Sequence, residues 1–311
     1  MTLAILCSGQ GPQHPNMFAL TGDAPEAANL FAHAATLLGG RDLRAIVQTD
    51  PDEAIHQNRV GQILCTLQAL AATATLRNGW PPRLIIAGYS VGEVAAWSVS
   101  GLMDATTTLD LVSRRAEAMD AASGPGDGLL FVRGLSRGTV EYLCDRHDAA
   151  IAIINPGDAY VLGGTGEALD IMADEGRKMG AARVVRVAVN VASHTFRLAG
   201  ASVEFRKVLD QIPMKDMPDV GARLFSGIDG SPVVNVAAGM DKLAKQISHT
   251  VQWAACLEGC VEAGASAFLE LGPGQSLSEM ATNAYPDIPA RSLEDFRTLQ
   301  GARAWLGCVV S

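Results

Sequence analysis

The chain has 311 residues, of which 48% are hydrophobic and 18% are charged, so it can bury the core of one large domain or of a large domain with a smaller one attached. Its formal net charge is −9 and its lysines and arginines form no cluster, which argues against nucleic-acid binding. Because the sequence has no run of 18 or more apolar residues and no basic N-terminal region, we expect neither a membrane span nor a signal peptide, but a cytoplasmic protein.

Cysteine usage also bears on location and metal binding. Six cysteines are scattered through apolar stretches, the pattern of reduced core thiols in a cytosolic protein. Only Cys256 and Cys260 lie close together, and neither a second pair nor a nearby histidine follows them. We therefore expect no metal site.

The elements before residue 124 alternate between strand and helix. Residues 3–8 are expected to form a buried strand that runs into a glycine turn, and residues 60–78 a long, mostly buried helix. A strand follows at 83–87, then a helix to about Ser98 and another from Asp104, which is suited to be its N-cap. This alternation, together with a strand expected at 267–272, predicts an α/β fold with a mainly parallel sheet.

The rhythm changes after the glycine-rich residues 123–128. The expected order becomes β-α-β-β-α-β, which is the ferredoxin-like pattern, with strands at 129–133, 150–155, 160–164 and 182–188 and helices at 136–147 and 166–179. We therefore expect a small ferredoxin-like domain at 125–190, inserted into a large α/β-hydrolase-like domain made of residues 1–124 and 191–311.

Residues 88–92 read Gly-Tyr-Ser-Val-Gly and stand between an expected strand and an alanine-rich helix. This is the context of a nucleophile elbow, where a sharp turn exposes the serine hydroxyl and the glycines leave room for the adjacent strand and helix. Ser90 would also lie at a helix N-terminus, where free N–H groups favour developing negative charge. An ordinary strand-to-helix turn with Ser90 as the helix N-cap is the structural alternative.

A serine nucleophile needs a base, and six histidines are available. His194 follows a strand-like run and directly precedes an expected helix, and sites in α/β proteins gather at strand ends. His194 is thus the best candidate for the base. The alternative, in which Ser193 or His194 serves only as a helix cap, stays open.

Six short motifs occur along the chain in one order: GQGPQ at 9–13, GYSVGE at 88–93, RRAEAM at 114–119, SH at 193–194, VQW at 251–253 and LGPGQSL at 271–277. Together they resemble the malonyl-CoA:acyl carrier protein transacylases over nearly the whole chain, inserted small domain included. Two positions differ from the usual motifs of that family. Tyr89 replaces a histidine and Pro12 replaces a serine, which makes the chain look most like the epsilon (transacylase) subunit of biotin-independent malonate decarboxylases.

The resemblance implies a role for each matched residue. Ser90 would carry the malonyl ester, and His194 would act as general base and then as general acid, in a dyad with no acidic third member. Gln10 and Val91 would supply backbone N–H groups to an oxyanion hole. Gln252 matches a position whose backbone carbonyl orients the histidine.

Arg115 would pair with the free carboxylate of the malonyl group, since the planar guanidinium can bind a carboxylate through two parallel hydrogen bonds. It stands four positions before Met119, as in the R-x-x-x-M of the family. The alternative is a solvated helix residue, because Arg114 lies beside it and Glu117 and Asp120 can pair with either arginine.

These observations lead to an expected acyltransferase that moves malonyl from malonyl-CoA to the thiol of an acyl carrier protein, within a malonate decarboxylase and alongside its other subunits. No permanently bound cofactor is expected, because the thiol belongs to the prosthetic arm of the carrier. The alternatives are the malonyl transacylase of fatty acid synthesis, a serine thioesterase or esterase, and a non-catalytic scaffold. Tyr89 is either a packing substitution beneath the elbow or a contact to the acyl group or the carrier arm.

Overall fold

Five parallel strands form the central sheet of the computed structural model, which describes residues 1–310. In spatial order they are β10 (Ala290–Ser292), β9 (Ala267–Glu270), β1 (Leu3–Cys7), β2 (Leu84–Gly88) and β7 (Ala222–Leu224). The expected parallel sheet is confirmed, and β1, β2 and β9 lie within two residues of the positions expected from the sequence.

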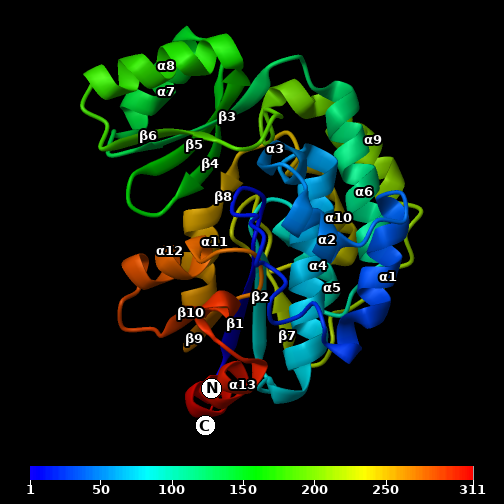
Figure 1. The fold of residues 1–311 in the computed structure, drawn as a ribbon. Helices are drawn as coiled ribbons and strands as arrows, with labels where there is room; N and C mark the ends of the chain where they lie inside the picture. Colours follow the sequence, from blue (N-terminus) through cyan, green and yellow to red (C-terminus); the bar gives the residue numbers. More distant parts are fainter. Residues whose placement is uncertain (311) are drawn as a thin grey trace.

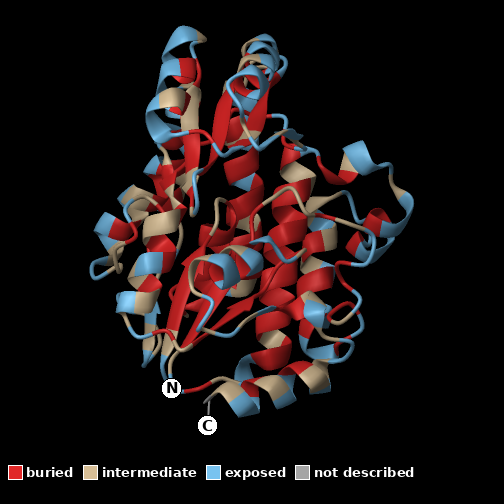
Figure 2. Ribbon diagram, turned by 90° about the vertical axis from the view of Figure 1, so that its left-hand side faces the viewer, coloured by how far each residue is buried: buried red, intermediate tan, exposed pale blue. Residues whose placement is uncertain are grey.

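Helices pack on both faces of this sheet (Figure 1). They are α1 (Ala28–Leu37), α2 (Leu43–Thr49), α3 (Asp52–Ile55), α4 (Asn58–Leu76), α5 (Gly92–Val99), α6 (Ala105–Ala122), α9 (Ala199–Leu209), α10 (Val236–Lys245), α11 (Trp253–Glu262), α12 (Ser276–Ala284) and α13 (Leu299–Val310). Almost every residue of α4 is buried, because it packs against both α5 and α6. Figure 2 shows that burial is concentrated in the sheet and in the helices that cover it.

A second, mixed sheet has the strand order β6-β3-β5-β4-β8. Its elements are β3 (Asp127–Arg133), α7 (Arg137–Arg146), β4 (Ala150–Asn155), β5 (Ala159–Thr165), α8 (Gly166–Lys178), β6 (Arg183–Val187) and the two-residue β8 (Val251–Gln252). The order of β3 to β6 is that of a ferredoxin-like unit. β8 comes from outside residues 125–190 and pairs in parallel with β4, so a strand from the remainder of the chain extends this sheet. The proposed domain boundaries stay a prediction.

The two faces of the second sheet pack into different hydrophobic cores, because successive side chains along a strand point in opposite directions. Leu130 and Leu162 lie in a small core with residues of α7 and α8. Leu129, Ile153 and Val161 belong to the same hydrophobic core as the central sheet. The inner face of the second sheet therefore packs onto the large core and stands above the carboxyl ends of β1 and β2 (Figure 1).

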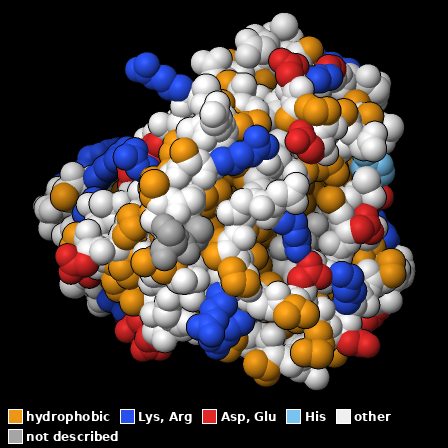
Figure 3. Space-filling model, turned by 90° about the horizontal axis from the view of Figure 1, so that it is seen from below, with side chains coloured by type: hydrophobic (Ala, Val, Ile, Leu, Met, Phe, Trp, Pro, Cys, Tyr) orange, Lys and Arg blue, Asp and Glu red, His pale blue; other side chains and the backbone are white. Residues whose placement is uncertain are grey.

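Within residues 1–310, no helix combines the length and apolar character needed to cross a bilayer, and no three His, Cys, Asp or Glu side chains cluster as metal ligands would. Cys256 and Cys260 are free, buried thiols on α11. In the view from below, which shows the end where the termini lie, acidic and basic side chains are interspersed (Figure 3).

Candidate active site

The turn between β2 and α5 holds Ser90 in a left-handed conformation, with φ of 55°. Such a φ is uncommon for a residue with a side chain and is typical of strained functional turns. The flanking glycines are required by space. A Cβ on Gly88 would come within 2.2 Å of the Glu93 backbone nitrogen, and a Cβ on Gly92 within 2.0 Å of the Cys7 carbonyl oxygen in β1. The geometry is that of a nucleophile elbow.

His194 lies directly beside this turn. Its Nε2 is 2.8 Å from Ser90 Oγ, although the two residues are 104 positions apart. His194 also has a left-handed backbone, with φ of 62°, in the loop after β6. On its far side, Nδ1 is 2.5 Å from the carbonyl oxygen of Gln246. If Nδ1 carries the proton and donates to this carbonyl, Nε2 is free to accept the proton of Ser90.

The backbone carbonyl in contact with His194 Nδ1 therefore belongs to Gln246 and not to Gln252, so the expectation for Gln252 is wrong. Gln246 is the C-cap of α10, where backbone carbonyl groups are left without helical partners and can accept a side-chain donor. Gln252 instead lies in β8, where it pairs with Ile154 of β4 and donates its N–H to Gly227. Gln246 ends α10 and Gln252 directly precedes α11, and no local pattern in the sequence shows which of the two carbonyl groups faces His194.

The surroundings of His194 disfavour its charged form. The side chain is 1% exposed. Burial, followed by the positive charge of Arg115, lowers its pKa to about 3, while the hydrogen bond to the Gln246 carbonyl opposes this shift. His194 is consequently neutral near pH 7 and available to accept a proton.

The elbow and the loop after β1 each carry one backbone N–H group suited to bind a developing negative charge. In the part of the chain that the structure describes, the amides of Gln10 and Val91 have no hydrogen-bond partner. Gln10 lies in the loop after β1, held by its side chain, which donates to the Asn58 carbonyl. Val91 directly follows Ser90 and caps α5. These are the two positions expected from the sequence for an oxyanion hole.

Arg115 is completely buried on α6 rather than solvated. Its Nη1 donates to Gln62 Oε1 at 2.6 Å, and its Nη2 makes a longer contact of 3.4 Å to Gln246 Oε1. Its Nε has no partner among residues 1–310. Burial lowers the pKa of the guanidinium to about 10, with Glu93 opposing the shift. Arg115 thus retains donor capacity, although it is not among the residues that line the cavity above Ser90 and His194.

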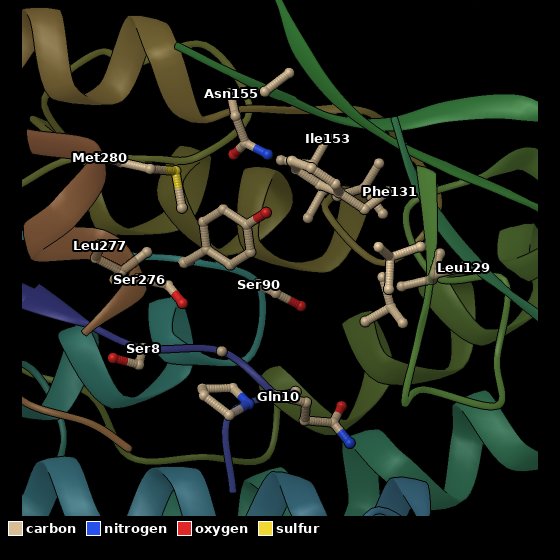
Figure 4. Close-up of a pocket in the computed structure, with 18 of the residues that line it drawn as sticks. Ser8, Gln10, Ser90, Leu129, Phe131, Ile153, Asn155, Ser276, Leu277 and Met280 are labelled. Atoms are coloured by element: carbon tan, nitrogen blue, oxygen red, sulfur yellow. The ribbon is translucent and has the colours of Figure 1, made fainter. Parts of the chain in front are cut away.

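A cavity of about 730 Å³ opens above Ser90 and His194. Figure 4 shows Ser90 in the middle of the lining residues, with Gln10 near it, Leu129 and Phe131 contributed by β3 and Met280 by α12. Its walls are largely apolar and come from both sheets. Three exposed arginines also line it: Arg133, Arg183 and Arg186. The volume and the position suit a small acyl group attached to a longer chain.

Tyr89 packs between the two sheets. Its ring meets that of Trp253 edge to face, with centroids 5.3 Å apart. Burial raises the pKa of the Tyr89 hydroxyl, and a hydrogen bond with Asn155 of β4 opposes the rise. Tyr89 also lines the cavity, so it has both a packing contact and access to a bound group.

Glu270 is a buried acidic residue that lines the cavity. Its carboxyl group accepts hydrogen bonds from Ser8 Oγ at 2.7 Å and from the backbone N–H groups of Leu277 and Ser278 at the start of α12. Burial raises its pKa to about 7. Glu270 thereby connects the loop that carries Gln10 with the helix that forms one wall.

Comparisons with known proteins agree with this geometry. Residues 5–294 match the family model described as acyl transferase domain. The chain is similar to a malonyl CoA-acyl carrier protein transacylase of Mycobacterium tuberculosis strain H37Rv, at 30% identity over 94% of this chain and 96% of the relative. It is also similar to the crystal structure of an acyl-carrier-protein S-malonyltransferase from Burkholderia pseudomallei. That match has a TM-score of 0.88 and 25% identity over 98% of this chain and all of the other.

A solved complex of a malonyl-transacylase with a type II PKS acyl-carrier protein matches with a TM-score of 0.88 and 25% identity, over 98% of this chain and 99% of that one. The elbow, the histidine beside it and the match across almost all of the sequence all indicate the same family. The chain belongs to the acyl transferase domain family.

Proposed function

We propose that this protein transfers a malonyl group from malonyl-CoA to the thiol of an acyl carrier protein through a malonyl ester on Ser90. The observation that carries the proposal is the 2.8 Å contact between Ser90 Oγ and His194 Nε2. Among residues 1–310, the Val91 amide in the elbow and the Gln10 amide in the loop after β1 have no hydrogen-bond partner. The 30% identity to a malonyl CoA-acyl carrier protein transacylase supports the choice of acyl group and acceptor.

In the first half-reaction, Ser90 Oγ attacks the thioester carbonyl carbon while its proton passes to His194 Nε2. The oxyanion that develops accepts hydrogen bonds from the amides of Gln10 and Val91, a contribution of roughly 3–4 kcal/mol per donor. The C–S bond then breaks, and His194 returns the proton to the departing CoA thiolate. In the second half-reaction, the carrier thiol gives its proton to His194, attacks the ester and restores the Ser90 hydroxyl.

Arg115 is the proposed partner of the malonyl carboxylate. Its unpartnered Nε and its long contact to Gln246 leave two donors that a carboxylate could engage. An acetyl group would leave this buried guanidinium without an added partner, which favours a dicarboxylic acyl group. The exposed Arg133, Arg183 and Arg186 along the cavity would face the anionic groups of CoA or of a carrier.

The nucleophile is tested by incubating the protein with radioactive malonyl-CoA and measuring the label that remains bound to it. Ser90→Ala should abolish labelling, because no other hydroxyl is in contact with His194 Nε2 among the hydrogen bonds of residues 1–310. Ser136→Ala, which removes an exposed hydroxyl at the start of α7, is the control and should label like the original protein. A Ser90→Ala variant that still takes up label would refute the assignment.

The acceptor is tested separately. A transferase should pass malonyl from Ser90 to a carrier thiol much faster than to water, whereas a thioesterase or esterase should do the reverse. The GYSVGE motif supports a place in malonate decarboxylase, while the transacylase relatives support the general transfer reaction. Comparing the carrier of a malonate decarboxylase with that of fatty acid synthesis as acceptors distinguishes these two roles, and a cytoplasmic location stays a prediction.

A further inference from the structure

The buried carboxyl group of Glu93 is connected to His194 through one intervening residue, Gln246. Glu93 is completely buried on α5, three positions after Ser90. Its Oε2 accepts a hydrogen bond from Gln246 Nε2 at 2.5 Å and another from the Gly227 amide at 3.0 Å. Gly227 can approach this closely because it has no side chain, since a Cβ there would stand 2.9 Å from Glu93 Oε2.

Gln246 binds His194 through its backbone carbonyl, and its own side chain is hydrogen-bonded to Glu93 and Arg115. Its carbonyl accepts from His194 Nδ1, and the carbonyl of the next residue, Ile247, accepts from the His194 amide at 2.8 Å. The side-chain contact to Glu93 is short, whereas the one to Arg115 is 3.4 Å long. Glu93 is therefore the stronger of the two side-chain anchors of the 246–247 segment.

Glu93 also decides which way the Gln246 amide faces. A carboxyl oxygen that accepts hydrogen bonds selects the NH2 end of the amide, which leaves Oε1 to face the guanidinium of Arg115. If the amide were reversed, its NH2 group would point at the Arg115 donors and its oxygen would face Glu93. The first contact would be repulsive, and so would the second wherever Glu93 is ionised, since burial raises the Glu93 pKa to about 7.

We propose that Glu93 is a positioning residue for His194, acting through Gln246 to hold the base in line with the Ser90 hydroxyl. The proposal rests on the proposed function, because it takes Ser90 and His194 as the reacting pair. In physical terms, Glu93 connects α5, which begins beside Ser90, to residues 246–247, whose carbonyl groups accept hydrogen bonds from His194. Unlike the contact to Arg115, this anchor does not involve the group proposed to bind the substrate carboxylate.

The test uses a fluorophosphonate, which reacts with an activated serine and carries no carboxylate for Arg115 to bind. Glu93→Gln should slow the modification of Ser90 by about 10- to 100-fold, the range seen when a group that orients a histidine from behind is removed in metal sites. The same variant should shift the proton resonance of the His194 Nδ1–H, which reports its hydrogen bond to Gln246 directly. Folding is checked by circular dichroism.

Asp127→Asn is the matched control, because Asp127 is also a buried acidic residue, and it pairs with Arg197 instead of Gln246. It has no contact with Gln246 among the interactions of residues 1–310. This variant should lose stability without slowing Ser90 modification or moving the His194 resonance.

A second variant keeps the proposal falsifiable if Glu93→Gln does not fold. Gln246→Ala retains the carbonyl that His194 uses but removes the amide that Glu93 holds, so it should slow modification to a similar extent. The double variant should be no slower than the slower single one, because both remove the same connection. Folded variants that react at the original rate, or losses that multiply in the double variant, would overturn the positioning role.

The two proposals fail in different ways. If Ser90→Ala is inert while Glu93→Gln reacts like the original protein, Ser90 remains the nucleophile and only the role of Glu93 falls. If the original protein is labelled by neither malonyl-CoA nor the fluorophosphonate, the proposed function falls and the positioning role with it.

Discussion

The environment of His194 makes the pH dependence of activity a test of the site. A base is active when it is deprotonated, and burial together with Arg115 lowers the His194 pKa to about 3. The acid limb of kcat/KM, which reports the free enzyme, should therefore lie well below the ordinary histidine pKa of about 6.5. Measurement of malonyl transfer to a carrier from pH 4 to 8 checks this, and an acid limb near 6.5 would contradict the buried, neutral histidine.

The same profile should shift once substrate is bound. A malonyl carboxylate paired with Arg115 would cancel part of the positive charge that acts on His194, so the histidine pKa should rise in the complex. The acid limb of kcat should then lie at a higher pH than that of kcat/KM. With acetyl-CoA, which brings no carboxylate, the two limbs should coincide more closely.

Arg115 should decide between donors. Arg115→Ala should reduce kcat/KM for malonyl-CoA by about 100-fold, since a charge-assisted pair is worth about 2–3 kcal/mol. The loss with acetyl-CoA should be much smaller. Arg114→Ala, on the same helix, removes an exposed arginine that contacts Gln211 and should change neither rate. Equal losses for the two donors in Arg115→Ala would refute the carboxylate role.

At the scale of elements, the elbow depends on the close approach of the α5 backbone to the β1 backbone. Gly92→Ala would place a methyl group within 2.0 Å of the Cys7 carbonyl oxygen, so α5 would have to move away from β1. We expect a loss of stability of at least about 1–3 kcal/mol, typical of overpacking, and a larger loss of Ser90 reactivity. Thermal unfolding and fluorophosphonate labelling measure the two effects.

Gly138→Ala is the matched control for this substitution. Gly138 is exposed in α7, and a Cβ there would meet nothing within 4 Å. The change should raise stability by about 0.4–1 kcal/mol through the unfolded chain and leave labelling unchanged. If Gly92→Ala behaved like Gly138→Ala, the close approach of α5 to β1 would not limit the elbow.

Local sequence patterns predicted those elements whose periodicity and turn residues lie within one contiguous stretch. The elbow was predicted because strand, glycines and helix are contiguous, and the β-α-β-β-α-β unit because its turns and periodicities alternate regularly. β7, β8 and β10 have only two or three residues, and they exist because distant strands offer them backbone partners. The error at Gln252 has the same origin, since only the folded position of α10 brings Gln246 to His194. Glu93 and Gln62 likewise give no sign in sequence that they face Gln246 and Arg115.

For the whole molecule, the contacts that join the second sheet to the large core determine whether the two parts unfold together. Its inner face shares the large core, β8 extends it, and Thr250 Oγ1 donates to the Ile151 carbonyl of β4. The cavity takes walls from both sheets. These connections imply that residues 125–190 and the remainder of the chain lose their structure together, so that damage to either core is felt by both.

Tryptophan fluorescence can test this coupling, because all four tryptophans lie outside residues 125–190. Trp97 and Trp253 are fully buried, so their emission reports unfolding of the large core. Leu130→Ala opens a cavity in the small core, at a cost of about 2–5 kcal/mol. If the two parts unfold as one, this substitution should lower the midpoint of the fluorescence transition in urea by a shift comparable to that of Leu257→Ala, which damages the large core directly. Independent unfolding would instead leave the fluorescence midpoint of Leu130→Ala unchanged, with a separate early transition visible only by circular dichroism.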